Sequence, residues 1–406
     1  MIKAAFLNCL RNRRRTALTG LSIALAVLVV VLLMSFTYSC FDSMLDNERR
    51  FSIGDIRIRT EKYSEFESLM PLQFYIENLS AIKERLLDTP GIKGAESVIR
   101  VYASLYRDSS LTNISVVGAD PGSAYMGEGT IIHSGRLAQD ETKEAMATPK
   151  LLSACGLEVG DSVTVIFRTA SGGTNAATFQ IVGSVGYMNA EMNGSMLVTS
   201  ASALSGILRI QDGTIEIHAW TEDGIDSKRM AEELRDRFSG EGLEIKAWQD
   251  VSVMYPMMPL YDTMVMIIVL LFFFIASTLV FNTMMMSTLE RKKEISTMIA
   301  IGFSRGYVIA QLVAEGLIIA LLFSVSGALI GKIIITVLGI TGMDLTGMGV
   351  ESVDGFGFPN ILYLELRSSR YLMAIAVEMA VTAAAGILAT WRVRKLEVAE
   401  ALREEE

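Results

Sequence analysis

Few residues of this 406-residue chain have a type and spacing that could carry out chemistry. Its two histidines, His133 and His218, lie far apart, and the sequence contains no HExxH, CxxC or GxSxG motif and no paired catalytic carboxylates. His218 shares one face of a predicted strand with Glu216 and Thr214, which indicates a solvated strand residue. The sequence therefore predicts no active site.

One segment, GALIGK from Gly327 to Lys332, is similar to a phosphate-binding loop. It is one residue too short, lacks the Ser or Thr that follows the lysine, and lies within an apolar helix. Glycines four residues apart, as at Gly327 and Gly331, instead favour close packing of membrane helices. We therefore expect that this chain does not hydrolyse ATP itself.

Three ionisable residues lie within predicted membrane helices, at Glu315, Lys332 and Glu378. Such residues are functional candidates by default, because a charge in lipid is costly. For Glu315 the favoured interpretation is a structural cap or ion pair near the cytoplasmic surface. For Lys332 it is a side chain that reaches the outer interface. The role of Glu378 stays open.

A second candidate site is a cluster of methionines and tyrosines where the second apolar helix meets the outer domain. Methionine is flexible and polarizable, so it suits a surface that accepts varied apolar ligands. Ordinary packing explains the cluster equally well. The candidate substrate contacts are Met254, Tyr255, Met257, Met258, Tyr261 and Met264.

The chain is organised around the stretch 260–305. Residues 260–287 are almost wholly apolar and long enough to cross a bilayer, and a charged run then marks a cytoplasmic exit. Apolar residues at helical spacing follow, and a glycine ends them, which predicts a short amphipathic helix able to touch a soluble partner. A stop-transfer signal with an ordinary loop is the alternative. The predicted coupling residues are Glu290, Arg291, Lys292, Lys293, Glu294, Ile295, Met298, Ile299 and Gly302.

Composition supports a membrane protein. The chain is 51% hydrophobic with a mean hydropathy of +0.39 and a net charge of −9, which argues against nucleic-acid binding. Residues 41–260 hold 31 acidic and 20 basic residues, whereas the predicted cytoplasmic segments 1–16, 288–306 and 392–406 hold 5, 4 and 4 basic residues. This positive-inside pattern places both termini in the cytoplasm. Three cysteines at unrelated spacings imply no disulfide framework.

Four membrane helices and one large outer domain follow from these patterns. The predicted order is an interfacial helix at 1–15, spans at 16–39, 260–287, 307–338 and 371–391, an extracytoplasmic domain at 46–258, a coupling helix at 288–305, an outer loop at 339–369 and a cytoplasmic tail at 392–406. The outer domain is predicted to be α+β. Two strand–helix–strand units suggest a split βαβ fold, interrupted by a mostly β insertion at about 121–212.

The charged stretch ERKKEISTMIAIGFSR at 290–305 resembles the cytoplasmic signature of MacB/FtsX-like ABC transporter permeases. The segment QLVAEGL at 311–317 is similar to the start of that family's third helix, and the tail from Arg392 to Arg403 resembles its ending, except that Val398 stands where proline is usual. Shorter likenesses are GADP at 118–121 and GLEVGD at 156–161. The resemblance covers essentially the whole chain.

The resemblance implies a non-catalytic permease subunit that works as a homo- or heterodimer with a separate ABC-type ATPase dimer, which binds the ATP and Mg. Its substrate would be a lipoprotein or another amphiphile, moved by mechanical transmission, with a lipoprotein, a periplasmic adaptor or a cell-wall hydrolase as a further partner. Alternatives are an FtsX-like regulator of a cell-wall hydrolase that moves no substrate, and a receptor without a motor. A Glu294→Lys, Ile295→Asp variant is expected to lose the ATPase.

Overall fold

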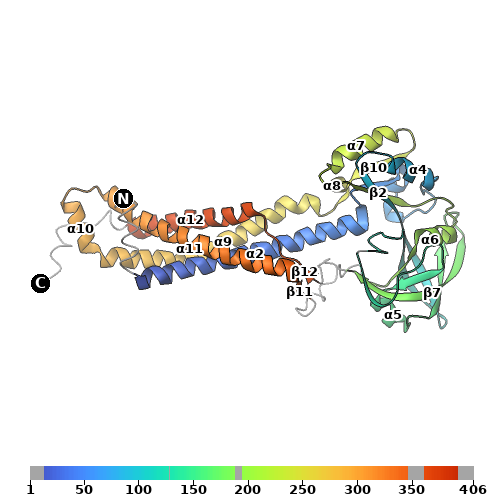
Figure 1. Ribbon diagram of the computed structural model, residues 1–406, viewed down its shortest axis with the longest axis horizontal. Coiled ribbons are helices and arrows are strands. Elements are labelled where there is room, and N and C mark those ends of the chain that lie inside the picture. Colours follow the sequence, from blue (N-terminus) through green and yellow to red (C-terminus); the bar gives the residue numbers. More distant parts are fainter. Residues whose placement is uncertain (1–12, 128, 188–193, 346–360, 392–406) are drawn as a thin grey trace. The chain divides into compact units, whose positions relative to one another are not determined.

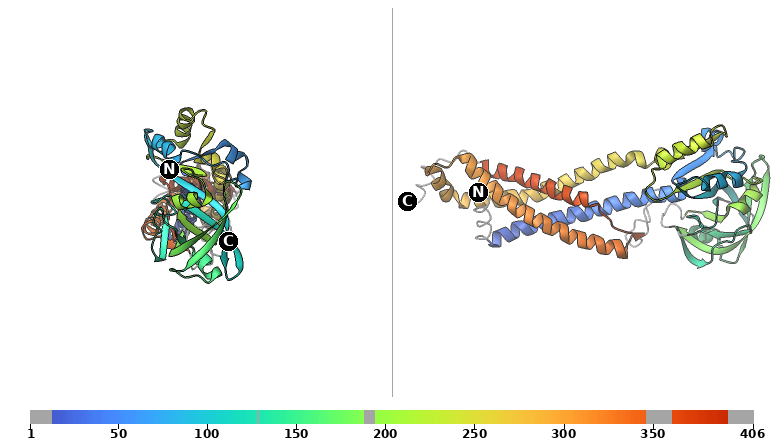
Figure 2. Two further views of the ribbon diagram at one scale, coloured as in Figure 1. Left: turned by 90° about the vertical axis from the view of Figure 1, so that its right-hand side faces the viewer. Right: turned by 45° about the horizontal axis from the view of Figure 1, so that its top comes forward.

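Long apolar helices form the first of two units into which the chain divides. In the computed structural model, which describes residues 13–127, 129–187, 194–345 and 361–391, four helices are long and apolar enough to cross a membrane. Figures 1 and 2 show that they run side by side. They are α2 (Arg13–Glu48), α9 (Met258–Glu290), α11 (Arg305–Thr341) and α12 (Ser368–Thr390), with the short helix α10 (Lys292–Ala300) between α9 and α11.

The first three helices contain their predicted spans, and α12 ends at Thr390, one residue before the predicted end of the fourth span. The first helix continues past residue 39 to Glu48, because residues 40–48 hold no glycine or proline and polar residues do not end a helix. The predicted outer loop 339–369 is shortened, since α11 continues to Thr341 and α12 begins at Ser368. The predicted segments 1–12 and 392–406, and residues 346–360 of the loop, lie outside the described residues.

Close packing of α2 against α11 explains the paired glycines. A Cβ added at Gly327 would lie 2.3 Å from the carbonyl oxygen of Ala24, and one at Gly331 would lie 3.1 Å from Val31. A side chain at residue 327 would therefore strike the backbone of α2, which cannot move aside as a flexible side chain can. The spacing of four residues serves helix contact, as the sequence predicts.

The second unit comprises residues 42–257 and 344–361. Its ten-stranded mixed sheet has the order β10-β1-β9-β2-β3-β8-β5-β7-β4, with β6 paired to both β2 and β7. The strands are β1 (Ile56–Thr60), β2 (Ile92–Arg107), β3 (Ser110–Ala119), β4 (Thr130–Gly135), β5 (Glu144–Ala147), β6 (Ser162–Arg168), β7 (Thr174–Tyr187), β8 (Met196–Ser200), β9 (Glu216–Thr221) and β10 (Leu243–Ala247).

Short helices connect and cover these strands. Figure 1 shows α4 and α7 beside β10 and the start of β2, and α5 and α6 at the other end of the sheet. The predicted helix ended by Gly156 is α5, and Gly156 has a φ of 60° that favours glycine. The remaining elements are η1 (Arg49–Ile53), α3 (Glu61–Glu65), η2 (Glu67–Leu69), α4 (Leu79–Leu87), α5 (Pro149–Cys155), α6 (Ala201–Leu208), α7 (Ser227–Arg237), α8 (Trp248–Val251), η4 (Tyr255–Met257), β11 (Met343–Asp344) and β12 (Ile361–Leu362).

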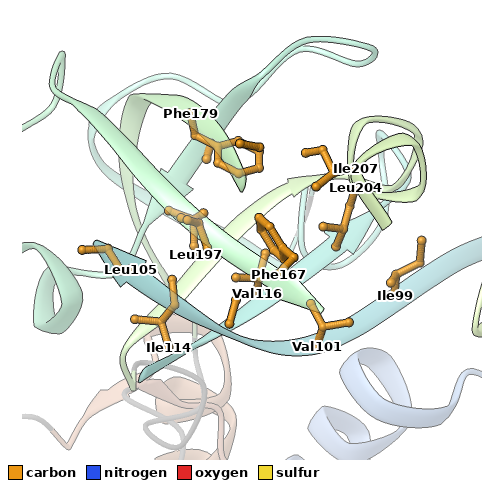
Figure 3. Packing of buried hydrophobic residues seen from close by; sticks show 14 of the residues in the cluster. Ile99, Val101, Leu105, Ile114, Val116, Phe167, Phe179, Leu197, Leu204 and Ile207 are labelled. Atoms are coloured by element: carbon orange, nitrogen blue, oxygen red, sulfur yellow. The ribbon is translucent and has the colours of Figure 1, made fainter. Parts of the chain in front are cut away.

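Part of this sheet closes on itself. The pairings run from β2 through β3, β8, β5, β7 and β6 back to β2, which makes a small barrel filled by side chains. Figure 3 shows Val101, Val116, Phe167 and Leu197 pointing toward one another inside it, with Leu204 of α6 beside them. Residues 121–212, where the sequence predicts an insertion, contain β4 to β8 with α5 and α6, and β5 to β8 are the strands that close the barrel.

Buried charges join the strands at the other end of the sheet. Arg59 on β1 donates from Nε and Nη2 to Oε2 of Glu216 on β9, at 2.8 and 2.7 Å, and its Nη1 lies 2.6 Å from Glu67. Oε1 of Glu216 lies 3.3 Å from Arg100 on β2 and 3.2 Å from His218 Nε2. Glu216 and His218 are 3% and 1% exposed. The prediction that His218 is solvated is therefore wrong.

Burial and the neighbouring charges shift the pKa values of Glu216 and His218 in this cluster. Burial disfavours the ionised form of Glu216, but Arg100, His218 and Arg59 more than offset it and hold the pKa of Glu216 well below its ordinary value. Burial lowers the pKa of His218 below its ordinary 6.5, although Glu216 acts in the opposite direction. The folded cluster therefore contains an ionised Glu216 and a neutral His218 at neutral pH.

We predict that Gly327→Ala destabilises the helical unit by about 1–3 kcal/mol, because the new methyl group overpacks the contact between α2 and α11. The thermal unfolding midpoint of the detergent-solubilised chain measures this. Gly306→Ala, also in α11 but with nothing within 4 Å of the added Cβ, is the matched control and should not lower the midpoint. Equal effects of the two substitutions would contradict this account of the helix contact.

Glu216→Gln should destabilise the second unit by about 3–5 kcal/mol, because it leaves the Arg59 and Arg100 guanidinium groups without their buried counter-charge. Hydrogen exchange of β9 amides in the full-length chain, at increasing urea, measures the change. The control Glu244→Gln removes a carboxylate from the partly exposed β10 and should cost less than about 1 kcal/mol. A Glu216→Gln cost as small as the control's would rule out the cluster as a stabilising contact.

The pH dependence of stability follows from the lowered pKa of His218. Because the unfolded chain binds the proton more readily, the free energy of unfolding should fall as the pH drops below about 6.5, and the lowered pKa of Glu216 adds a further loss below about 4.5. His218→Gln should remove only the first part. Urea unfolding of the unchanged chain and of His218→Gln, at several pH values between 7 and 4, measures how the free energy of unfolding depends on pH. If the two proteins lose stability in parallel as the pH falls, the role of His218 is disproved.

Candidate functional site

The charged turn after the second long helix is fixed by one arginine. The helix α9 ends at Glu290, and Arg291 separates it from α10, which begins at Lys292. The Arg291 side chain donates from Nη1 to Glu315 of α11 at 2.9 Å and from Nε to Glu294 at 2.8 Å. Burial disfavours the arginine charge, but Glu294 and Glu315 more than offset this and raise the pKa of Arg291. Glu315 therefore makes the structural ion pair expected of it.

The buried face of α10 packs on α11. Ile295 is 1% exposed and contacts Val308 and Leu312, with Met298 and Ile299 partly buried beside it. Ile295 cannot therefore offer its side chain to a soluble partner, which corrects its predicted role. Its place is in the anchor of the helix, so the Ile295→Asp change of the double variant would disrupt this packing as well as any docking surface.

The exposed end of α10 is apolar. Gly302 has a φ of 111° and ends the helix, as predicted, while the amide of Phe303 donates to the carbonyl of Met298 at 3.1 Å. This turn leaves Ile301 74% exposed and Phe303 45% exposed, and Phe303 stacks on Tyr307. Lys293 and Glu294 lie on the exposed side of α10. Sequence periodicity did not single out Ile301 and Phe303, because only the turn geometry exposes them.

A cavity of about 620 Å³ opens within the second unit, against the outer side of β2 and β3. That volume suits a small ligand. Its wall combines the end of α2 with η1, the strands β2 and β3, Tyr125 after β3, the start of β8 with the two residues before it, and the segment before α9. The lining residues are Met44, Asn47, Glu48, Ser52, Arg100, Tyr102, Ser115, Val117, Tyr125, Gly194, Ser195, Met196, Val253, Met254 and Met257.

Hydrogen bonds fix two walls of this cavity. Glu48 accepts a hydrogen bond from the Ser252 hydroxyl and another, at 2.9 Å, from the amide of Val253. These bonds hold the following segment, with Met254 and Met257, in place. Elsewhere in the wall, Arg100 donates from Nη2 to the carbonyl oxygen of Phe51, and the Tyr125 hydroxyl donates to the same oxygen at 3.1 Å. The cavity is therefore built into the unit by specific contacts.

The structure divides the predicted methionine cluster. Met254 and Met257 line the cavity, and Tyr255 packs against Trp248 with ring centroids 5.1 Å apart. Tyr261, in the helical unit, stacks on Phe41 at 4.3 Å and donates its hydroxyl to Thr37 at 2.6 Å. Met258 and Met264 also belong to α9 in that unit and do not line the cavity.

Sequence analysis missed Met44, Met196, Asn47 and Arg100. They come from three distant stretches, and folding alone brings them to one cavity. Met44 and Asn47 lie in the part of α2 beyond the predicted span, where no sequence signal indicated a helix. The methionine pattern at 254–264 therefore predicted only the part of the cavity wall that this segment supplies, at Met254 and Met257.

The remaining membrane carboxylate and lysine take different positions. Lys332 is exposed on α11. Glu378 is fully buried in α12 and accepts a hydrogen bond from Thr382 of the same helix at 3.1 Å, while its Oε2 has no partner among the described residues. Within the described part of the chain, no group of three or more His, Cys, Asp or Glu residues could hold a metal ion.

Two family models match the chain. The model of the MacB-like periplasmic core domain matches residues 16–237, and that of the FtsX-like permease C-terminal region matches residues 266–398. No curated protein matches the chain by sequence.

Solved structures show distant likeness. The periplasmic region of MacB from Actinobacillus actinomycetemcomitans is 16% identical, with 52% of this chain and 95% of that chain covered and a TM-score of 0.38. The extracellular domain of the noncanonic ABC-type transporter YknZ from Gram-positive bacteria is 14% identical, with 47% and 98% covered and a TM-score of 0.34. The first family model spans more than half of the chain, and with the second it accounts for both units. The chain therefore belongs to the MacB/FtsX-like ABC transporter permeases.

Proposed function

We propose that this chain is a permease subunit that couples ATP hydrolysis by a separate ABC-type ATPase dimer to movements of its extracytoplasmic unit. The substrate would be a lipoprotein or another amphiphile, and ATP and Mg would bind to the partner. The chain would lie in the cytoplasmic membrane with both termini inside and would act as a dimer, because four helices are too few to enclose a pathway. Family membership and the positive-inside charge pattern support this proposal.

The anchored helix α10 carries the proposal. It is held to α11 by the packing of Ile295 and by the Arg291–Glu315 ion pair, so a force applied to α10 would reach both α9 and α11. Its apolar end, at Ile301 and Phe303, and the charged pair Lys293 and Glu294 present a mixed surface suited to a soluble protein. A stop-transfer loop would need neither the buried anchor nor the exposed apolar end.

The methionine-lined cavity favours substrate handling over signalling alone. A regulator of a cell-wall hydrolase needs an exposed protein-binding patch, whereas a cavity with Met44, Met196, Met254 and Met257 in its wall suits a flexible apolar ligand. Membrane lipid would contact the helical unit.

We also propose that the sheet segment β10-β1-β9-β2 is a split βαβ unit. The strand β9 pairs with both β1 and β2, and β1 also pairs with β10. All three pairings are antiparallel. The helices α4 and α7 supply buried residues to one core, which supports this interpretation.

We predict that Ile301→Glu lowers the amount of ATPase that co-purifies with the chain at least about tenfold, because it places a charge in the apolar centre of the docking surface. Gentle detergent purification from the native host, followed by mass spectrometry, measures this. The matched control Ile132→Glu changes an exposed isoleucine of β4 and should leave co-purification unchanged. Normal co-purification of a membrane-inserted Ile301→Glu, Glu294→Lys variant would disprove the assigned role of α10.

A further inference from the structure

The cavity in the second unit contains hydrogen-bond donors that the protein itself does not use. We propose that it binds an amphiphile whose uncharged carbonyl group accepts hydrogen bonds from Asn47 and Arg100, while its apolar chain lies against the methionines. This inference rests on the proposed function, since it names the polar group by which an amphiphilic substrate would be recognised.

Asn47 is the first of these donors. Its side chain is 7% exposed and lines the cavity, and its Nδ2 atom has no hydrogen-bond partner among the residues that the structure describes. A buried amide that lacks a partner destabilises a folded protein, so such groups in a cavity wall indicate where a ligand supplies the missing acceptor. A hydrophobic residue of similar size would cost less if the cavity served packing alone.

Arg100, on β2, supplies the second donor. Its Nη2 atom donates to the carbonyl oxygen of Phe51 and lies 3.3 Å from Glu216, which fixes the guanidinium plane. Its Nε atom is buried and has no partner within the described part of the chain. Because the group is held in place before a ligand arrives, little side-chain entropy is lost when it donates a hydrogen bond.

The charges around the cavity favour an uncharged ligand group. Glu216 and Glu67 form ion pairs with three arginines, Arg57, Arg59 and Arg100. The carboxylate of Glu48, which lines the same cavity as Arg100, offsets the remaining positive charge. Each carboxylate oxygen of Glu48 accepts one hydrogen bond, from Ser252 or Val253, which fixes the carboxylate in the cavity wall. An ester or amide carbonyl oxygen accepts hydrogen bonds from such donors and requires no counter-charge.

The apolar wall selects for a flexible chain. Met44, Met196, Met254 and Met257 come from three separate stretches of the sequence, and Tyr102 and Val253 extend the same wall. Thioether side chains adapt to chains of different length and branching. The methionines would therefore supply affinity with little selectivity, and the two donors would supply the selectivity.

Equilibrium binding to the full-length chain in phosphatidylcholine nanodiscs tests the proposal without any ATPase. The probes are radiolabelled N-dodecanoylglycinamide, dodecanoate and dodecyltrimethylammonium, which share one chain and differ in the head group. The uncharged amide should show saturable binding above that of empty nanodiscs and should bind more tightly than either charged probe. If dodecanoate binds more tightly than the amide, the proposal of an uncharged head group is wrong. If none of the three probes shows saturable binding, the cavity is not a ligand site.

Two substitutions of one residue test the donor. Asn47→Leu should weaken binding of the amide about tenfold, the loss expected for one hydrogen bond, and should leave binding of dodecyltrimethylammonium unchanged. Asn47→Asp keeps the shape, replaces a donor with a carboxylate, and should reverse the preference toward the cationic probe. The matched control Asn113→Leu changes an exposed asparagine of β3 and should alter nothing.

An Asn47→Leu protein that binds the amide as tightly as the unchanged chain would overturn the role of the donor. Because the nanodiscs contain no ATPase, these outcomes are independent of co-purification. If Ile301→Glu leaves ATPase co-purification unchanged, the proposed docking of the ATPase on α10 is contradicted and the ligand site is unaffected. If the amide probe does not bind, the ligand site is contradicted and the docking of the ATPase is unaffected.

Discussion

The buried contact between Arg59 and Glu216 is the interaction on which the second unit most depends. It joins the neighbouring strands β1 and β9, and the other carboxylate oxygen of Glu216 lies 3.3 Å from Arg100 on β2. Arg100 in turn holds Phe51 and one wall of the cavity. A charge that is buried away from water is stable only when an opposite charge or a hydrogen-bond partner lies beside it. The position of Glu216 therefore fixes the positions of Arg59 and Arg100.

The same cluster explains why one prediction failed. Along β9, Glu216, His218 and Trp220 alternate with Ile217 and Ala219, a pattern typical of a strand with one face in water. Alternation distinguishes the two faces of a strand, but it does not distinguish water from a protein interior in which charges compensate one another. Here the polar face is covered by Arg59, Arg100 and Glu67, all of which are distant in sequence from β9.

Hydropathy predicted the helical unit well, because a long apolar run depends on no distant residue. The four helices, the glycine contact at Gly327 and the turn at Gly302 all followed from local sequence. What local sequence could not supply was the direction of side chains around α10. Ile295 fits the pattern of a docking residue, yet it is buried because Val308 and Leu312 of the next helix fold back onto it. The exposed apolar residues follow instead from a left-handed glycine that turns Ile301 and Phe303 outward.

The apolar and the polar residues of the cavity would serve different purposes in binding a ligand. Methionines from distant stretches form a wall that tolerates many apolar shapes, so the wall alone could not distinguish a substrate from membrane lipid. Discrimination requires polar groups whose hydrogen bonds only some ligands can complete, and a donor buried beside an apolar wall penalises every ligand that lacks the acceptor. Asn47 and Arg100 occupy that position, because each lines the cavity and has a buried donor atom without a partner among the described residues. Selectivity in this unit would therefore come from two donors, while the methionines let one site accept chains of different shape.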